Sequence, residues 1–304
     1  MKKVSKNQKA NNLKNNDLKT NDLKDKALRY SLITVIILVF LIILISYIRK
    51  QSSTILKNDF SDPLNIQEKI VFDDIKIKMN NDIFSYDQIR NEVKEKDLLS
   101  YYEKNLKKGD TILYVSQDVG VQQLFMAKLV SPSGRVYVVN PFEKYNDTIE
   151  LSAQANGFKS RILTKTAAIS DNSFEGFLVY KNDESPEYGK IRTSDYKVER
   201  GFNALKVNVS TLDSSYPNLR NINFLRITTK INAEKVIAGA SRIIKYSPNI
   251  KIILDYEKDL FQAPIIRNSL KDESFKFYLI NEKGEISPAH FDKITEGHIL
   301  IQRD

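Results

Sequence analysis

The sequence lacks cysteine altogether and holds only two histidines in 304 residues. Without cysteine the chain forms no disulfide and offers no thiolate to a metal ion. The histidines, His290 and His298, stand eight positions apart in a region patterned as loop and strand, which is not the spacing of a metal-binding pair. Neither a P-loop nor a Gly-x-Ser-x-Gly nucleophile elbow is present. We therefore expect no metal site, and the sequence supports neither P-loop nor serine-hydrolase chemistry.

The net charge of +9 is unevenly distributed along the chain. Residues 1–29 contain nine Lys or Arg and three Asp, which gives +6, so the remaining 275 residues carry only +3. No segment of the globular part interleaves basic and aromatic residues as a binder of single-stranded nucleic acid does. The sequence therefore predicts no nucleic-acid partner.

Tyr30 to Ile48 is a run of 19 residues without charge, bracketed by Arg29 and Arg49. A helix of that length rises about 28 Å, close to the thickness of the hydrocarbon layer. The alternative is a cleaved signal peptide, but the apolar region of such a peptide is usually about 7–15 residues long and ends in small residues. We predict one transmembrane helix over residues 30–48.

The flanks of this segment predict its orientation and its surroundings. Residues 1–29 form a low-complexity basic tail, which we expect to be disordered, and residues 49–81 form a juxtamembrane connector with a strand-like run around Ile70 to Ile77. Basic residues tend to remain in the cytoplasm. We therefore predict a single-pass protein of the bacterial inner membrane, with a cytoplasmic N-terminus and with residues 82–304 across the membrane as one globular domain.

Strands and helices alternate through the globular part. We expect one helix from Ser85 to Gly109 and a polar loop at 181–200. The remaining elements that we expect are strands at 111–115, 135–139, 161–164, 205–209, 222–228, 251–255, 275–280 and 298–302, helices at 119–130, 143–156, 233–246 and 265–271, and a hairpin at 174–180. This alternation predicts an α/β, Rossmann-like fold with a mostly parallel sheet and an antiparallel C-terminal strand pair.

Residues 82–302 resemble the FkbM-type methyltransferases, which use S-adenosylmethionine as cofactor. The resemblance lies in landmarks that agree in order and spacing: Gly109-Asp110-Thr111, Ala127 to Val130, Pro132 to Val136, Ala168, Ser170 and Asp171, Thr211-Leu212-Asp213, Leu225 to Ile227, Val236, Gly239 and Ala240, and Glu282 to Glu285. It implies the methyltransferase fold and, for an active member, methyl transfer to a hydroxyl group of a sugar or another small molecule.

The positions that would hold the cofactor in this family are mostly substituted. Tyr114 stands in place of an aspartate, Ser116 in place of a glycine and Asp118 in place of an asparagine, while Gly120 is kept. Asn140 stands where an acidic residue would accept hydrogen bonds from both ribose hydroxyls, and an amide lacks that charge-assisted geometry. Further along, the family's aspartate, glutamate and glycine are replaced by Thr228, Lys230 and Ile231.

These substitutions leave two interpretations open. The first is a membrane-anchored protein with a degraded cofactor site, no catalysis and a binding or scaffold role for a small-molecule or protein partner. The second is an active or repurposed methyltransferase that binds S-adenosylmethionine. Asp255 and Glu257, at the end of a predicted strand, are either a surviving acidic pair or residues of a solvated loop. The catalytic residues stay unassigned.

Overall fold

The computed structural model describes residues 66–72, 74–80, 83–182, 189–229, 232–258, 263–270, 272, 274–291 and 293–303. They belong to one compact unit, Phe60–Asp304. The predicted tail, the transmembrane helix at Tyr30 to Ile48 and most of the connector lie outside the described residues. None of the helices that the structure describes combines the length and the apolar character needed to cross a membrane.

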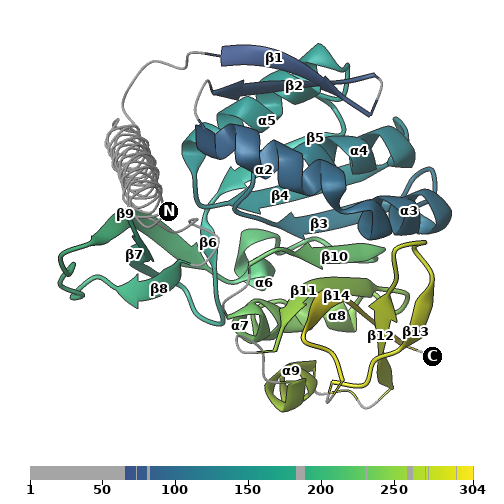
Figure 1. The fold of residues 1–304 in the computed structure, drawn as a ribbon. Coiled ribbons are helices and arrows are strands. Elements are labelled where there is room, and N and C mark those ends of the chain that lie inside the picture. Colours follow the sequence, from purple (N-terminus) through teal and green to yellow (C-terminus); the bar gives the residue numbers. More distant parts are fainter. Residues whose placement is uncertain are drawn as a thin grey trace, which may run out of the picture. The chain divides into compact units, whose positions relative to one another are not determined.

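An eight-stranded sheet forms the centre of the described part (Figure 1). Its parallel strands lie in the order β5-β4-β3-β10-β11, and β14 then runs antiparallel between β11 and β12, with β13 at the edge. The strands are β3 (Thr111–Val115), β4 (Arg135–Asn140), β5 (Ile162–Thr166), β10 (Phe224–Ile227), β11 (Lys251–Glu257), β12 (Phe275–Ile280), β13 (Ile286–Pro288) and β14 (Glu296–Arg303). The predicted mostly parallel sheet and its antiparallel C-terminal pair are confirmed.

Helices cover both faces of this sheet. One face packs against α2 (Ile83–Lys94), α3 (Lys96–Asn105), α4 (Val121–Val130) and α5 (Glu143–Ala155). The other packs against α6 (Leu212–Ser215), α7 (Ala233–Ala238), α8 (Ser241–Lys245) and α9 (Ala263–Leu270). The chain reaches β4 and β5 on one side of β3 and reaches β10 and β11 on the other. This reversal makes the carboxyl ends of β3 and β10 a topological switch point, where α/β folds bind ligands.

Two of the predicted helices are each divided into two. The helix expected from Ser85 to Gly109 is α2 and α3, separated at Glu95, whose backbone leaves the helical region with φ −73° and ψ 61°. The helix expected at 233–246 is α7 and α8, separated at Gly239 and Ala240. A Cβ on Gly239 would lie 2.2 Å from the carbonyl oxygen of Ser170, so glycine permits a close backbone approach there.

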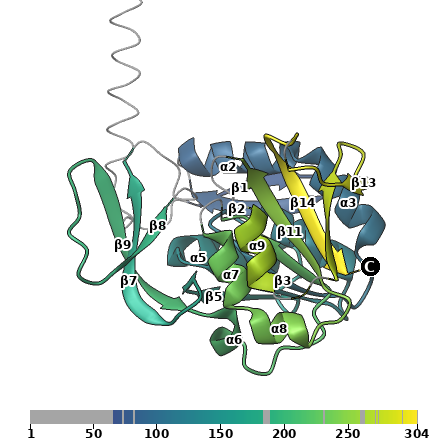
Figure 2. The same ribbon diagram turned by 90° about the horizontal axis from the view of Figure 1, so that it is seen from below.

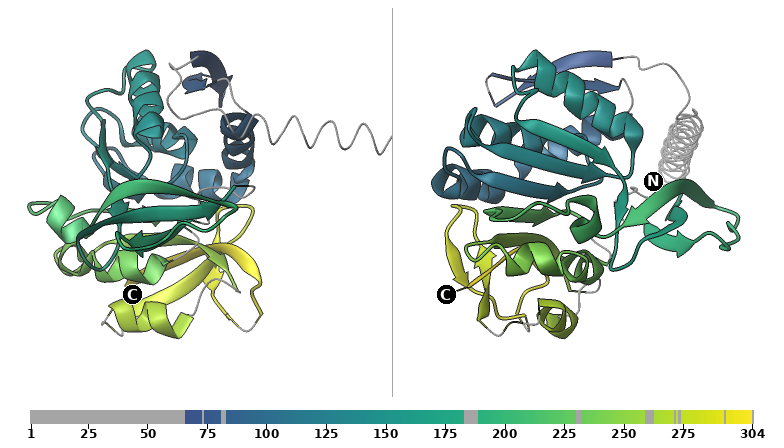
Figure 3. Two further views of the ribbon diagram at one scale, coloured as in Figure 1. Left: turned by 90° about the vertical axis from the view of Figure 1, so that its left-hand side faces the viewer. Right: turned by 180° about the vertical axis from the view of Figure 1, so that it is seen from behind.

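A second, four-stranded sheet holds β6 (Ala168–Ile169), β7 (Phe174–Lys181), β8 (Lys190–Thr193) and β9 (Phe202–Ser210) in the order β6-β9-β7-β8. The hairpin predicted within 174–180 is wrong, because this segment is the single strand β7, which pairs with β8 and β9. The predicted loop at 181–200 likewise contains β8. Figure 1 shows this sheet beside the carboxyl ends of β3 and β4, and in Figures 2 and 3 it again stands at one side of the large sheet.

The strand-like run at Ile70 to Ile77 is a hairpin of β1 (Ile66–Val71) and β2 (Ile75–Asn80). Backbone groups of β2 pair with polar side chains of α5: Lys76 N donates to Asn156 Oδ1 at 2.9 Å, and Lys78 N donates to Ser152 Oγ at 2.7 Å. The side chains of Ile75 and Ile77, which belong to β2, are buried. The hairpin therefore adds a further layer over α5.

Candidate functional site

The candidate site lies at the carboxyl ends of β3 and β4. The loop Ser116 to Gly120 follows β3, and Asn140 is the last residue of β4. Ser116 N donates to Val139 O at 2.9 Å, which holds the start of the loop against β4. The parallel pairing of β3 and β4 thus brings together four of the five positions named from the sequence, namely Ser116, Asp118, Gly120 and Asn140.

Asn140 is completely buried, and its amide joins β4 to the loop. Nδ2 donates to the carbonyl oxygen of Asp118 at 2.9 Å and to Ser116 Oγ at 3.3 Å, and Oδ1 accepts from Phe142 N at 2.9 Å. Both amide hydrogens are therefore used within the protein. At the position for which the sequence resemblance implies a ribose-binding carboxylate, this chain has a group that holds its own loop.

Gly120 precedes α4 with a left-handed backbone, φ +105°. A Cβ there would lie 2.5 Å from Cγ1 of Ile149, a buried residue of α5. Both the backbone conformation and the packing of α5 therefore require glycine, with or without a ligand. Its presence alone is no sign of cofactor binding.

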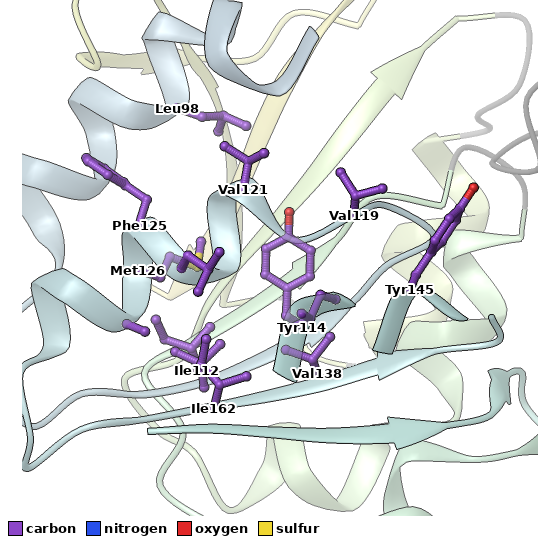
Figure 4. Packing of buried hydrophobic residues seen from close by; sticks show 14 of the residues in the cluster. Leu98, Ile112, Tyr114, Val119, Val121, Phe125, Met126, Val138, Tyr145 and Ile162 are labelled. Carbon is purple, nitrogen blue, oxygen red and sulfur yellow. The ribbon is translucent and has the colours of Figure 1, made fainter. Parts of the chain in front are cut away.

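Tyr114 lies apart from the other named positions, because its side chain enters the layer between the sheet and the helices. In Figure 4 its ring stands among the buried residues of β3, β4 and α4, and its hydroxyl is directed to the side of Val119 and Val121. The hydroxyl donates to Gln122 Oε1 at 3.2 Å, and the Tyr102 hydroxyl donates to the same oxygen at 3.1 Å. Burial raises the pKa of Tyr114 well above its ordinary value. A neutral phenol thus stands where the sequence resemblance implies an aspartate.

Asp118 is half-buried in the loop that precedes α4. Its Oδ1 accepts a hydrogen bond from Gln123 Nε2 at 2.6 Å. A carboxylate near a helix N-terminus is favoured by the exposed N–H groups there. Glu92 of α2 reaches the same helix end, where its Oε2 accepts from Gln122 N at 3.1 Å. Glu92 therefore accepts a hydrogen bond from one of the backbone N–H groups that this helix end could otherwise offer to an anionic ligand.

A small recess remains between the carboxyl ends of the strands and the second sheet. Its volume is about 20 Å³, which holds about one water molecule. Ile191 of β8 lines it from the side of the second sheet. The recess is lined by Val115, Ser116, Gln117, Pro141, Ala167, Ala168, Ile169, Gly189, Ile191, Thr229 and Asn232. Thr229, whose buried hydroxyl has no hydrogen-bond partner within the described part, was not singled out from the sequence.

A second group of polar residues lies at the ends of β10 and β11 and at the start of β14. Arg226 Nη2 contacts Asp255 Oδ1 at 2.5 Å, and Asp255 Oδ1 lies 3.4 Å from His298 Nε2. His298 Nδ1 is 2.5 Å from Asp97 Oδ2 of α3, and Glu95 Oε2 is 3.9 Å from His298 Nε2. Hereafter Glu95, Asp97, Arg226, Asp255 and His298 are called the charged cluster.

The contacts within the charged cluster exclude one of the two interpretations of Asp255, the solvated loop. Asp255 belongs to β11 and is paired with Arg226, so a solvated loop is wrong for this residue. Glu257 ends the same strand. The sequence analysis did not single out Arg226 as a functional residue. The feature that could have identified it is its position as the single charged residue in the apolar strand Phe224–Ile227. In the described residues no three His, Asp or Glu side chains are placed to hold a metal ion.

No family model matches the sequence, and no curated protein matches it. Solved structures with a similar fold include an rRNA methylase, described as putative, from Clostridium thermocellum, at 12% identity over 68% of this chain and 93% of that one, with a TM-score of 0.41. An S-adenosylmethionine-dependent O-methyltransferase from Thermotoga maritima shares 11% identity over 78% and 77% of the two chains, with a TM-score of 0.40. A fibrillarin from Aeropyrum pernix with natively bound S-adenosyl-L-methionine shares 10% over 81% and 86%, with a TM-score of 0.37.

These likenesses concern the fold alone, and they assign neither a ligand nor an activity to this chain. The observed strand order, the antiparallel β14 and the helices on both faces place the chain in the α/β, Rossmann-like class.

Proposed function

We propose that this chain is a membrane-anchored, FkbM-like protein whose S-adenosylmethionine site no longer supports catalysis and which acts by binding a partner. The observation that carries the proposal is the Asn140 amide, which is buried and engaged with Ser116 Oγ, Asp118 O and Phe142 N. The recess beside it is small, with a volume of about 20 Å³.

The predicted membrane topology supports the same proposal. S-adenosylmethionine is made in the cytosol, whereas the basic tail predicts that the globular domain lies on the other side of the membrane. A domain in that place has no supply of the cofactor. A fold kept without its cofactor remains available as a binding surface for a small molecule or a protein.

Calorimetric titration of the full-length chain with S-adenosylmethionine tests the proposal. We expect a Kd weaker than about 1 mM, because each lost charged hydrogen bond costs about 1.5–3 kcal/mol and more than one is missing. A Kd in the low micromolar range would overturn it.

A matched pair of variants sharpens this test. Asn140→Glu with Ser116→Gly supplies a carboxylate and more space, whereas Asn140→Gln with Ser116→Gly supplies the same length without the charge. Tighter binding by the first variant alone would identify the missing carboxylate as the cause of weak binding. If neither variant binds S-adenosylmethionine and both stay folded, residues other than 116 and 140 also prevent cofactor binding.

The second candidate is an active or repurposed O-methyltransferase acting on a hydroxyl of a sugar or another small molecule. The charged cluster favours it, because His298 beside Asp97 is a group able to accept a proton. Transfer of a labelled methyl group from S-adenosylmethionine to a hydroxyl compound would support this candidate, together with its loss in His298→Gln.

A further inference from the structure

The break between α2 and α3 lies against the charged cluster. Glu95 is the one residue between the two helices, and its carboxylate accepts a hydrogen bond from Gln122 Nε2 of α4. Asp97, in the first turn of α3, contacts His298 of β14. The joint between the helices is thereby attached to α4 on one side and to the sheet on the other.

The attachment is made by ionisable groups that are largely withdrawn from water. The exposed fractions of the side chains are 1% for Arg226, 15% for His298, 18% for Asp255, 20% for Asp97 and 30% for Glu95. The ionisable groups that face one another here are Glu92 from α2, Glu95 from the joint, Asp97 and Tyr102 from α3, Tyr114 from β3, Asp118 from the loop after β3, Arg226 from β10, Asp255 from β11 and His298 from β14.

With His298 protonated and Glu95 neutral, the charged cluster is electrically balanced. Arg226 and His298 then carry two positive charges, and Asp97 and Asp255 carry two negative charges. Ionising Glu95 and removing the proton from His298 leaves three carboxylates around one guanidinium. Like charges repel strongly where water is largely excluded.

We propose that the α2–α3 joint is a pH-dependent clamp, which holds the two helices on the carboxyl edge of the sheet at mildly acidic pH and loosens as the pH rises through neutrality. This inference does not depend on the proposed function. It rests on two attachments, that of Glu95 to α4 and that of Asp97 and Glu95 to His298 of β14, in which Glu95 and His298 are the groups that change charge.

The pKa shifts give this clamp its direction. Burial, and then the charge of Asp255, raise the pKa of Glu95 from 4.5 to about 7. Burial alone would lower the pKa of His298, but its hydrogen bond with Asp97 and the charge of Asp255 outweigh burial and raise the pKa above 6.5. Burial alone would raise the pKa of Asp97, but its hydrogen bond with His298 and the charge of His298 outweigh burial and lower the pKa. Asp97 therefore stays charged near neutral pH.

A pKa that is raised in the folded state contributes stability at low pH, and this contribution is lost as the pH rises through the raised value. For Glu95 the loss runs from its ordinary value of 4.5 to about 7. For His298 it begins near 6.5 and extends upward. Both groups therefore weaken the clamp as the pH rises, and they act in the same direction.

Amide hydrogen exchange of the full-length chain in mild detergent tests the clamp. Exchange is measured at about pH 6 and about pH 8 and corrected for the intrinsic rate. We expect protection of residues 93–102 to fall up to about tenfold, the factor that a pKa of about 7 against 4.5 implies over this interval, and protection of β4 and α5 to stay constant.

Two variants and two controls decide the outcome. Glu95→Gln keeps an acceptor for Gln122 without a charge and should remove most of the pH dependence, whereas the exposed Glu103→Gln on α3 should not. His298→Gln should lower protection at pH 6, and the exposed His290→Gln should leave it unchanged. Equal protection at both pH values in the wild type, an unchanged response in Glu95→Gln, or a uniform fall across the whole domain would each overturn the clamp.

Discussion

At residue 140 the difference between an amide and a carboxylate changes what the end of β4 can hold. An amide donates as well as accepts, so Asn140 satisfies the Asp118 carbonyl and the Phe142 N–H at once. A carboxylate could accept from Phe142 but could not donate to the loop. Asn140 therefore stabilises the observed position of the loop after β3.

We expect Asn140→Ala to lower the free energy of unfolding by about 2–4 kcal/mol, because it leaves a buried N–H and a buried carbonyl without partners. Urea denaturation of the full-length chain in mild detergent measures this loss. Asn203→Ala, at an exposed position on β9, serves as the control and should cost less than about 0.5 kcal/mol. A loss as small as that of the control would show that Asn140 does not hold the loop.

At the scale of elements, the packing of α4 against α5 explains why a glycine precedes α4. The sequence resemblance attributes Gly120 to the cofactor loop, whereas the structure places Ile149 where its side chain would be. Local sequence predicted both helices, at 119–130 and 143–156. It could not predict that these helices meet at residue 120, because that contact depends on the crossing of segments 29 residues apart.

We expect Gly120→Ala to destabilise the protein by about 2–5 kcal/mol, from a strained left-handed backbone and a clash in a packed core. Gly157→Ala is the matched control: it shares the positive φ, at +70°, but its Cβ would meet nothing within 4 Å. Only the strain of about 1–2 kcal/mol should remain there. Equal losses in the two variants, compared by urea denaturation, would mean that Ile149 moves aside without cost.

At the scale of the whole molecule, the division of charge between the tail and the globular part predicts the orientation in the membrane. Residues 1–29 carry +6 of the total charge of +9. This prediction concerns residues outside the described part, and no contact in the structure bears on it. It matters for function because it decides whether the domain has access to cytosolic S-adenosylmethionine.

Labelling of introduced cysteines tests the orientation, and the absence of native cysteine provides a clean background. We expect an impermeant thiol reagent on intact cells to label Ser194→Cys, an exposed position between β8 and β9, and to leave Asn11→Cys unlabelled. The reverse pattern would place the domain in the cytosol, remove the supply argument and favour the active methyltransferase. Permeabilised cells, in which both positions should react, provide the control.

Hydrophobic periodicity and turn residues determined most of the fold from the sequence alone. The order of strands and helices, the parallel sheet and its antiparallel end follow from patterns that extend over five to fifteen residues. The divided helices were missed because apolar periodicity continues across the breaks at Glu95 and Gly239. The strand β8 was missed because its residues, Lys190 to Thr193, are mostly polar and exposed.

The sequence resemblance also pointed to Tyr114, Ser116, Asp118, Gly120 and Asn140, but only the tertiary structure decided what their side chains contact. Tyr114 points into the core, whereas Asn140 turns onto the loop, and neither orientation is encoded in local spacing. Asp97, Arg226, Asp255 and His298 come from four elements spread over 201 residues, and the order of the strands brings them together. Charge pairing between such distant residues leaves no periodic trace in a sequence, since its partners are chosen by the packing of the whole sheet.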